Sequence, residues 1–461
     1  MTFPRYPEYK DSGLEWLGEV PAHWEVVKLG YLAISKGGGT PPKDELHYWN
    51  GSIPWVTPKD MKQQWITSTI DTLSEEALHA SAVSMIEPGH VLMVFRSGIL
   101  RHRIPAAINK IPLTVNQDLR AYDVRPRLVP EFFLRLTQGL NSELLIEWSK
   151  QGATVESLDS ELVRSTQLPV PPMSEQEAIT AFLDHETARI DALVQEQQRL
   201  IELLKEKRQA VISHAVTKGL DPNVPTKDSG VEWLGEVPAH WEMVRLKQMV
   251  AVQGGATPAK DRPDFWDGEI PWVSPKDMKK VRIDDAQDHI SVKALSETGL
   301  ATIEPGAVLI VVRGMILAHS VPVGIAEAPL TINQDMKALT PTGRCSSEYL
   351  LLLLSGIKNA IFCFIDASAH GTRKLEWERF ENIWVPLPSV TEQESTCSEV
   401  FEGVEDTYKL IAAATSAMSL LGERRSALIS AAVTGKIDVR GWKPPASTTT
   451  ESREAASTEA V

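Results

Sequence analysis

The sequence predicts an α+β fold built twice: two β-rich globular domains, each followed by one long α-helix. Three observations lead to this prediction. The chain repeats itself at a constant offset, the one that separates Lys10 from Lys227. Each copy opens with short apolar runs that Gly and Pro interrupt, which is typical of strands and turns. Each copy then closes with a segment of helical apolar periodicity. The chain is therefore a tandem duplication, and its two copies can adopt pseudo-two-fold symmetry.

The repeat extends over nearly the whole chain. SGLEWLGEVPAHWE at 12–25 returns as SGVEWLGEVPAHWE at 229–242, and PLTVNQD at 112–118 returns as PLTINQD at 329–335. A solenoid repeat is only about 20–50 residues long, whereas a unit of this length can bury its own core. We therefore expect one globular domain in 1–173 and a second in 219–390.

Within each globular domain, apolar runs such as HVLMVF at 90–95 and AVLIVV at 307–312 predict strands. The Trp-rich phrase at the start of each copy has two interpretations, core packing or a binding platform. Core packing is favoured because indole rings bury a large apolar area.

The long helices are predicted at 174–218 and 391–436. Ser174 with Glu177, and Thr391 with Glu394, have the spacing of a helix capping box. Apolar residues then follow each other at near-heptad spacing. The predicted packing positions are Leu183, Ile190, Leu193, Leu200, Leu204, Val211, Val400, Leu410, Leu421 and Leu428.

Roughly 40 residues of helix would make a rod of about 60 Å. One interpretation is that each helix lies solvated on its own domain. The other, which the apolar stripes favour, is that the two helices pair as a coiled-coil spacer, antiparallel if the pseudo-two-fold axis holds. The small polar residues of 437–461 predict a disordered C-terminal tail.

Composition sets further limits. With 43% hydrophobic and 23% charged residues and no long apolar run, the chain resembles an ordinary soluble protein without a membrane segment. Three cysteines, all in the second copy, do not form a duplicated disulfide framework or zinc site, which favours the cytoplasm. The net charge of −14 means that any nucleic-acid binding must use local basic loops or a partner's contacts.

Catalytic motifs are missing from the sequence. We find no phosphate-binding loop, no dinucleotide-binding glycine motif, no Asn-Pro-Pro-aromatic motif of amino-methyltransferases, no His-Glu-x-x-His and no paired Cys-x-x-Cys. We therefore expect no catalytic residue, metal site or cofactor in this chain.

The combined motifs resemble one known family. Two copies of G-G-x-T-P, W-x-G-x-I-P-W-V-x-P-K-D-M, E-P-G-x-V-L and N-Q-D, each followed by a Pro-rich segment and a long helix, are similar to the DNA-specificity (S) subunit of type I restriction-modification systems. The resemblance implies a non-enzymatic subunit whose two target recognition domains each read one half of a bipartite, gapped site on double-stranded DNA. It also implies that the helices set the gap and dock two methyltransferase subunits.

The same resemblance implies that S-adenosylmethionine, ATP and Mg²⁺ belong to partner subunits, including restriction and translocase subunits. The candidate DNA contacts are cations, amides and small residues in repeated loops, because such groups reach phosphates and base edges. In the first copy they are Lys59, Lys62, Arg96, Ser97, Gly98, Arg101, His102, Arg103, Asn116 and Gln117. In the second copy they are Lys276, Lys279, Lys280, Arg282, Arg313, Gly314, Met315, His319, Asn333, Gln334, Arg373 and Lys374.

Several alternatives stay open at this point. The two Asn-Gln pairs fit adenine recognition and the capping of a buried turn equally well. The chain as a whole could instead be a DNA nuclease or methyltransferase with an unrecognised active site, or a scaffold without DNA contact. The similarity of the two copies predicts a gapped site whose halves are inverted copies at most positions.

Overall fold

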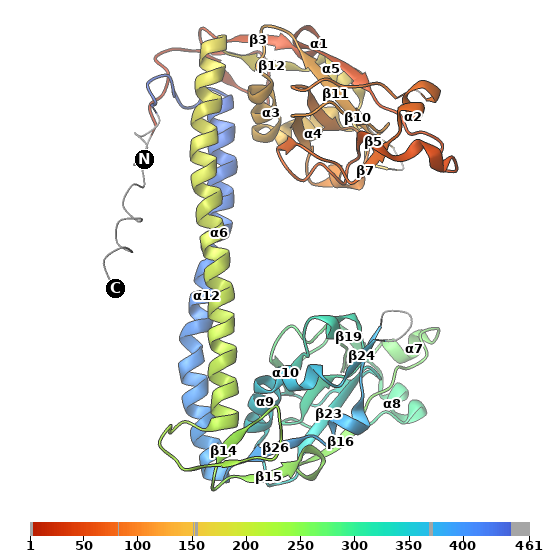
Figure 1. Ribbon diagram of the computed structural model, residues 1–461, viewed down its shortest axis with the longest axis vertical. Helices are drawn as coiled ribbons and strands as arrows, with labels where there is room; N and C mark the ends of the chain where they lie inside the picture. Colours follow the sequence, from red (N-terminus) through yellow and green to blue (C-terminus); the bar gives the residue numbers. More distant parts are fainter. Residues whose placement is uncertain (1–2, 82, 151, 153–154, 368–371, 444–461) are drawn as a thin grey trace, which may run out of the picture. The chain divides into compact units, whose positions relative to one another are not determined.

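The computed structural model describes residues 3–81, 83–150, 152, 155–367 and 372–443. It divides into two compact units (Figure 1). Unit 1 comprises Met1–Gln197 and Ser416–Val461, and unit 2 comprises Gln198–Thr415. Each unit thus contains one globular domain and a part of both long helices. The mixed α and β architecture and its duplication are as predicted.

The core of unit 1 is a five-stranded sheet in the order β4-β11-β8-β9-β6. Its pairs are antiparallel except for the parallel pair β6–β9. The central strand β8 is buried at every position because both of its faces are covered. The strands are β4 (Ala33–Gly37), β6 (Trp65–Ile66), β8 (Val91–Val94), β9 (Ala106–Asn109) and β11 (Leu119–Val124).

Smaller sheets surround this core. A three-stranded sheet in the order β10-β5-β7 pairs β5 parallel with β10 and antiparallel with β7. Two antiparallel pairs, β1–β2 and β3–β12, complete the unit. These strands are β1 (Tyr9–Asp11), β2 (Glu19–Pro21), β3 (Glu25–Lys28), β5 (Trp49–Val56), β7 (Asp71–Leu73), β10 (Thr114–Val115) and β12 (Gln167–Val170).

Short helices close the faces of the unit 1 sheets. The longest of them, α3, starts with Pro130 in its first turn, where the missing N–H costs no hydrogen bond, and buries Phe132, Phe133 and Leu136. The helices are α1 (Leu29–Leu32), η1 (Leu46–Tyr48), α2 (Glu75–Ala80), η2 (Gly98–Arg101), α3 (Pro130–Gly139), α4 (Asn141–Trp148) and α5 (Ser160–Ser165).

Unit 2 repeats this plan in the second copy. Its sheets have the orders β16-β23-β20-β21-β18 and β19-β17-β22, with pairs β13–β14, β15–β26 and β24–β25. The strands are β13 (Thr226–Asp228), β14 (Glu236–Pro238), β15 (Glu242–Arg245), β16 (Val250–Gly254), β17 (Ile270–Val273), β18 (Arg282–Ile283), β19 (Asp288–Ile290), β20 (Val308–Val311), β21 (Val323–Ala326), β22 (Thr331–Ile332), β23 (Met336–Pro341), β24 (Ile365–Ala367), β25 (Arg373–Leu375) and β26 (Trp384–Leu387). The helices are η3 (Leu246–Gln248), α7 (Pro263–Trp266), α8 (Val292–Thr298), η4 (Met315–Ala318), α9 (Ser347–Gly356), α10 (Lys358–Phe362) and α11 (Trp377–Phe380).

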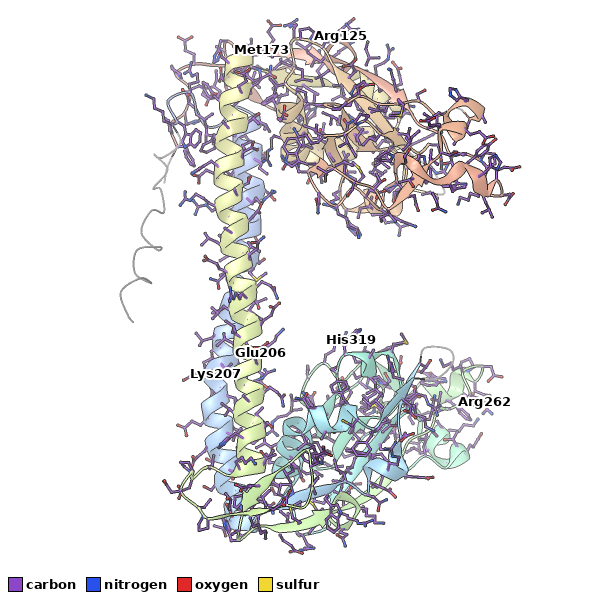
Figure 2. The ribbon with its side chains drawn as sticks, viewed as in Figure 1. Arg125, Met173, Glu206, Lys207, Arg262 and His319 are labelled. Carbon is purple, nitrogen blue, oxygen red and sulfur yellow. The ribbon has the colours of Figure 1, made fainter. Side chains whose placement is uncertain are left out.

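Two long helices, α6 (Met173–Lys218) and α12 (Val390–Val433), contribute to both units. Side chains project from both helices along their length (Figure 2). In unit 1 the core includes Phe182 near the start of α6 and Val433 at the end of α12. In unit 2 it includes Val216 near the end of α6 and Val400 near the start of α12. Each globular domain therefore packs against the beginning of its own helix and the end of the other.

The repeated Trp-rich phrase attaches each domain to a helix. Trp24 is fully buried, and its Nε1 donates to Glu175 Oε1 at 3.0 Å, while His23 Nε2 lies 2.8 Å from Glu175 Oε2. In unit 2, Trp241 Nε1 donates to Glu392 Oε1 at 2.8 Å. These indoles are thus core residues that hold a carboxylate in the first turn of a long helix, where it also faces the positive end of the helix dipole.

The predicted capping boxes are wrong. Helix α6 begins at Met173 and α12 at Val390, so Ser174 and Thr391 lie inside the first turn. In the second copy, Ser389 Oγ accepts the backbone N–H of Glu392 at 3.3 Å. The first copy has Pro172 next to its helix, and its carbonyl accepts the N–H groups of Glu175 and Gln176.

The predicted packing seam needs a correction of phase. Leu183, Ile190 and Val400 are buried, and Leu204, Leu421 and Leu428 are half-buried. Leu193, Leu200, Val211 and Leu410, however, are exposed by 44%, 41%, 40% and 54%. Their neighbours Val194, Ile201 and Ile411 face inward instead, with Ile201 only 6% exposed. Adjacent apolar residues satisfy the same spacing, so the periodicity alone selects the wrong one of each pair.

The packed part of the chain also extends into the predicted C-terminal tail. Val439 is buried, the Trp442 ring makes an edge contact with Phe182, and Asp438 N donates to Pro4 O at 2.8 Å. The predicted boundary at 437 is therefore too early. The remainder of that tail, 444–461, lies outside the described residues.

Candidate nucleic-acid interface

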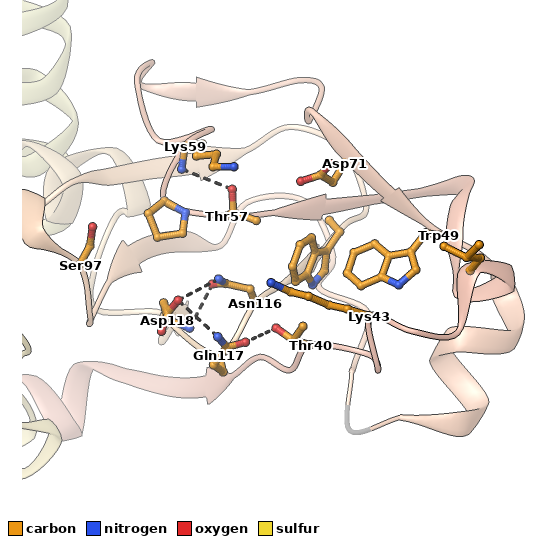
Figure 3. Close-up of a pocket in the computed structure, with 13 residues that line it drawn as sticks. Thr40, Lys43, Trp49, Thr57, Lys59, Asp71, Ser97, Asn116, Gln117 and Asp118 are labelled. Atoms are coloured by element: carbon orange, nitrogen blue, oxygen red, sulfur yellow. Dashed lines mark hydrogen bonds between the residues drawn. The ribbon is translucent and has the colours of Figure 1, made fainter. Parts of the chain in front are cut away.

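A pocket of about 600 Å³ opens beside β5 in unit 1 (Figure 3). We call it the first tryptophan pocket. Figure 3 shows Lys43 extending along the indoles towards Asn116. The lining residues are Thr40, Lys43, Leu46, Trp49, Trp55, Thr57, Pro58, Lys59, Asp71, Ser97, Asn116, Gln117 and Asp118.

The two indoles form the apolar wall. Their rings meet edge to face, with centroids 5.1 Å apart and planes at 81°. Trp49 Nε1 donates to the carbonyl of Pro42 at 3.2 Å, and Trp55 Nε1 donates to Gly39 O at 3.0 Å. The loop between β4 and η1 is therefore fastened to the wall at two points, which places Lys43 over the pocket.

A glycine in this loop permits the close approach. A Cβ added to Gly38 would lie 1.9 Å from the carbonyl oxygen of Val115, so no side chain fits there without a backbone shift. In unit 2, a Cβ added to Gly255 would likewise lie 2.0 Å from the carbonyl oxygen of Ile332. This contact explains why the Gly-Gly-x-Thr-Pro motif and the Asn-Gln-Asp motif recur together, although they stand far apart in the sequence.

The Pro-Lys-Asp-Met motif builds a second wall. Asp60 Oδ2 accepts hydrogen bonds from Thr57 N at 2.8 Å and from Thr57 Oγ1 at 2.9 Å. Asp60 Oδ1 accepts the N–H of Ile70 at 2.9 Å. Asp60 thus fixes the turn that carries Lys59, and the exposed Lys59 ammonium stays available at the pocket.

The Asn-Gln-Asp motif forms the floor of the pocket. Asn116 is buried, its Oδ1 accepts the N–H of Asp118 at 3.0 Å, and Asn333 does the same for Asp335 at 3.1 Å. The asparagines therefore cap a buried turn. Gln117 is exposed on that turn and binds Thr40. All three residues of the motif line the pocket, and the glutamine is the most exposed of them.

Unit 2 contains the equivalent pocket, also of about 600 Å³, which we call the second tryptophan pocket. Every residue that lines it is the repeat counterpart of a residue that lines the first. Its indoles, Trp266 and Trp272, again meet edge to face at 5.0 Å. The lining residues are Thr257, Lys260, Trp266, Trp272, Ser274, Pro275, Lys276, Asp288, Asn333, Gln334 and Asp335.

A second hollow, of about 660 Å³, adjoins the first tryptophan pocket, and Gln117 lines both. Arg96, Arg120 and Lys150 give it a cationic lining. Arg120 lies over the Phe95 ring, 5.0 Å from the centroid, and Arg96 Nε is 3.6 Å from Asp118 Oδ1. A surface with several lysine and arginine heads around exposed amides suits a polyanion with hydrogen-bonding edges.

The 3₁₀ turns η2 and η4 follow the central strands β8 and β20, and Ser97, directly before η2, lines the first tryptophan pocket. In unit 1, Ser97 N donates to Glu156 O at 3.0 Å, and Arg101 Nε binds Glu156 Oε1 at 2.9 Å. In unit 2, Gly314 N donates to Arg373 O at the same 3.0 Å. His319 follows η4 at the domain surface, where Figure 2 labels it.

The other predicted residues are distributed as follows. Turn η2 contains Gly98 and Arg101, and it is followed by His102 and Arg103. Turn η4 begins at Met315, directly after Arg313 and Gly314. Strand β25, beside η4, carries Arg373 and Lys374. Lys62 lines a small hollow with Lys59, and Lys280 Nζ is 3.9 Å from Asp284. Lys279 precedes β18 in unit 2, and Arg282 is the first residue of that strand.

Arg282 is already engaged within the fold. Its guanidinium binds Glu327 at 2.7 Å and Glu348 at 2.9 Å, and these hydrogen bonds raise its pKa further above the ordinary arginine value. Sequence reasoning also missed Lys43, Lys260, Asp71, Asp288 and the paired indoles. Their recurrence in both copies is the one signal that the sequence carries for them.

No cluster of potential metal ligands occurs among the described residues. Within the same ranges, no helix combines the length and apolar composition needed to cross a bilayer.

Comparison with known proteins gives the family. Residues 21–203 and 238–412, well over half of the chain, match the family described as type I restriction modification DNA specificity domain. The specificity subunit of the EcoR124I/EcoR124II type I restriction enzyme of Escherichia coli is 34% identical over 205 residues, covering 44% of this chain and 50% of that protein. The MjaIX specificity subunit of Methanocaldococcus jannaschii is 25% identical over 297 residues, covering 63% and 65%.

The matches therefore span about half to two thirds of the length of these curated relatives. A chain from a solved structure of complex assembly and conformational transition in the type I R-M system has a TM-score of 0.67 and 18% identity. It covers 90% of this chain and 98% of that one. This likeness shows that the two chains share a fold.

Proposed function

Because the chain belongs to the type I restriction-modification DNA specificity family, we propose that it is the DNA-specificity subunit of such a system. Each globular domain reads one half of a bipartite, gapped site on double-stranded DNA. The chain itself performs no chemistry. S-adenosylmethionine, ATP and Mg²⁺ are bound by its partners, which are two methyltransferase subunits and restriction or translocase subunits.

The duplicated tryptophan pocket is the observation that carries this proposal. One chain presents the same lysines, amide and indoles twice, once in each domain. A surface that is built twice suits a ligand that offers the same kind of group twice, and a DNA duplex does so through its two-fold symmetric backbone. Lys59, Gln117 and Arg96, with Lys276, Gln334 and Arg313, are the foremost candidates for contact.

The net charge of the chain is consistent with DNA binding by the chain and its partners together. With a net charge of −14, the protein has little long-range attraction for phosphates, so its partners must supply many phosphate contacts. Lysines and arginines nevertheless line the hollows, where they can contact phosphates and base edges. In this division, this chain would select the DNA sequence, and its partners would supply most of the electrostatic binding energy.

The two long helices act in this proposal as an antiparallel coiled-coil spacer that sets the gap. Two contacts support it, one in each unit. Arg425 of α12 binds Asp191 of α6 at 2.9 Å in unit 1, and the Arg208 guanidinium lies 4.6 Å from the Tyr408 ring centroid in unit 2. In both units the earlier part of one helix meets the later part of the other.

Apolar side chains that remain exposed on the helices are the proposed methyltransferase docking surface. They project from both helices and are exposed by 40–62% in the chain alone. In unit 1 these side chains are Leu193 on α6 and Leu420 on α12; in unit 2 they are Leu200, Leu203 and Val211 on α6, with Tyr408 and Leu410 on α12.

The test combines the chain with its methyltransferase partner. We expect a complex of one chain and two methyltransferases that shifts DNA in a gel and methylates one gapped motif, with affinity falling steeply as salt rises. The chain alone, given DNA, Mg²⁺ and S-adenosylmethionine, should show no turnover. Methylation or cleavage by the chain alone would replace this function by that of an enzyme. An identical gel shift without the chain would leave it only a scaffold.

A further inference from the structure

The two tryptophan pockets are chemically alike. Seven lining residues are identical in the two pockets, and Thr57 is matched by Ser274. The identical pairs are Thr40/Thr257, Lys43/Lys260, Trp49/Trp266, Trp55/Trp272, Lys59/Lys276, Asp71/Asp288 and Gln117/Gln334. The fastening bonds match as well, since Trp55 Nε1 and Trp272 Nε1 donate to glycine and alanine carbonyls at 3.0 and 2.9 Å. A group that fits one pocket therefore fits the other in the same pose.

The walls beside the pockets differ, although their backbones match. Ser97 N–Glu156 O and Gly314 N–Arg373 O are both 3.0 Å, and the bridges Arg96–Ser157 and Arg313–Lys374 occupy equivalent places. Six side chains on these two walls change, whereas Arg96, Ile99, Leu100 and His102 have identical counterparts in the second copy. The changed pairs are Ser97/Gly314, Gly98/Met315, Arg101/Ala318, Arg103/Ser320, Glu156/Arg373 and Ser157/Lys374.

The two walls carry their cationic side chains on different segments: on the turn in unit 1 and on the strand beside the turn in unit 2. In unit 1 the turn is cationic through Arg101 and Arg103, and the segment beside it carries the acid Glu156 that holds Arg101. In unit 2 the turn is apolar, with Met315 exposed by 65%, and Arg373 and Lys374 supply the cations from β25. A cationic turn suits guanine acceptors or phosphate, whereas an apolar turn suits the methyl group of thymine.

We propose that the two tryptophan pockets read the polar edge of the same base pair in both half-sites, and that the walls formed by η2 with 156–157 and by η4 with β25 determine where the half-sites differ. This inference rests on the proposed function and specifies which residues divide the reading. Lys43 and Lys260 become specificity residues that donate to the common base pair. The recognised site is then an interrupted inverted repeat with a localised mismatch between its halves.

The structure dictates in which direction the walls can be exchanged. Gly314 has φ +139°, a conformation that residues with side chains rarely adopt, so serine would be strained there. Ser97, at φ −180°, is extended and accepts glycine, and a Cβ on Gly98 would meet nothing within 4 Å. Converting the first wall to the second is thus compatible with the backbone, whereas the reverse exchange is not.

The experiment determines the methylated motif, by methylome sequencing, in hosts that carry the full chain with its methyltransferase partner. Three chains are compared: the unaltered chain, the wall exchange (S97G, G98M, R101A, R103S, E156R and S157K) and the control L14V, which lies outside the pockets and the walls and makes one position of the repeated Trp-rich phrase equal to its counterpart Val231. We expect the unaltered chain to give halves that share an inversion-related base pair, the exchange to make both halves inverted copies, and the control to leave the motif unchanged.

Binding of oligonucleotide duplexes with the motif supplies a second readout. Lys43→Ala and Lys260→Ala, which alter exposed side chains, should each weaken binding of the complex about tenfold and relax selectivity at the shared base pair of one half only. Halves without a shared inversion-related base pair, or a wall exchange that folds, methylates and leaves the motif as it was, would overturn the inference. If no chain supports methylation or DNA binding with its partner, the proposed function fails instead.

Discussion

Arg425 Nε donates a hydrogen bond to Asp191 Oδ1 at 2.9 Å, and the equivalent positions of the other copy, Arg208 and Tyr408, form a cation–π contact in unit 2. The same place between the two long helices thus holds an ion pair once and an aromatic contact once. The arginine is the same in both copies, whereas its partner is an aspartate in unit 1 and a tyrosine in unit 2.

The ion pair should contribute little to stability. Asp191 and Arg425 are both partly exposed, and exposed pairs contribute at most about 1 kcal/mol. In a double-mutant cycle with Asp191→Ala and Arg425→Ala, we expect a coupling of about 0.5 kcal/mol in the free energy of unfolding, and less at high salt. A coupling several times larger would mean that the pair is shielded from water. Tyr408→Asp, which offers Arg208 the partner found in unit 1, serves as the matched comparison.

Two glycines mark where each domain meets the end of the other repeat's helix. A Cβ on Gly139 would lie 2.8 Å from Val433 Cγ2 and 3.1 Å from the backbone carbon of Ile429, and on Gly356 it would lie 2.5 Å from Val216 Cγ2. Because the backbone on the far side must move, Gly139→Ala and Gly356→Ala should lower the free energy of unfolding by about 1–3 kcal/mol. Thermal or urea unfolding measures the change.

The matched controls are Gly403→Ala and Gly422→Ala on α12, where a Cβ meets nothing within 4 Å. Alanine has the higher helix propensity, so these changes should stabilise the protein by up to about 1 kcal/mol. If all four substitutions shift stability in the same direction, the packing of domain against helix is not as tight as these distances imply.

Much of this architecture is predictable from the sequence, and the reasons for the failures are specific. The constant offset between the copies predicts the duplication, and the apolar runs at 90–95 and 307–312 correspond to β8 and β20. The phase of the helix seam is not predictable, because Leu200 and Ile201 are adjacent apolar residues and both fit a heptad spacing. The pocket is not predictable either, since Lys43, Asp71 and Gln117 meet only through the β10-β5-β7 sheet and its loops.

The corrected seam separates folding from assembly. Ile201 is buried, so Ile201→Asp places a charge in a packed position and should destabilise the helices strongly. Leu200 is its exposed neighbour on the proposed docking surface, so Leu200→Asp should leave the unfolding transition nearly unchanged and still lose methyltransferase binding. Thermal unfolding of the chain and size-exclusion chromatography of the complex measure the two effects. Equal destabilisation by both variants would mean that Leu200 packs in the seam, as the sequence predicts.

Cysteine reactivity should follow burial. Loss of solvation raises the pKa of the buried Cys345 and Cys397 thiols to about 12, whereas Cys363 is exposed. Iodoacetamide at neutral pH should therefore label Cys363 first, and mass spectrometry should find the other two labelled only in denaturant. Because the folded state favours these neutral thiols, their contribution to stability is complete below the ordinary thiol pKa and declines as pH rises towards 12. Rapid native labelling of Cys345 would show that this core opens.

The last prediction concerns the gap in the DNA site. A heptad of helix adds about 10.5 Å, which equals about three base pairs at roughly 3.4 Å each. A heptad, two helical turns, also nearly restores the phase of the apolar face. A heptad inserted between Leu193 and Leu200 needs a matching heptad between Leu410 and Ala417, because in the proposed antiparallel pair both helices must lengthen together. We expect the double insertion to lengthen the gap of the methylated motif by about three base pairs and to leave the bases of both halves unchanged. The single insertion in α6 serves as the comparison and should impair assembly, since one helix would then bulge. A double insertion that methylates at the original gap would show that the helices do not set the spacing.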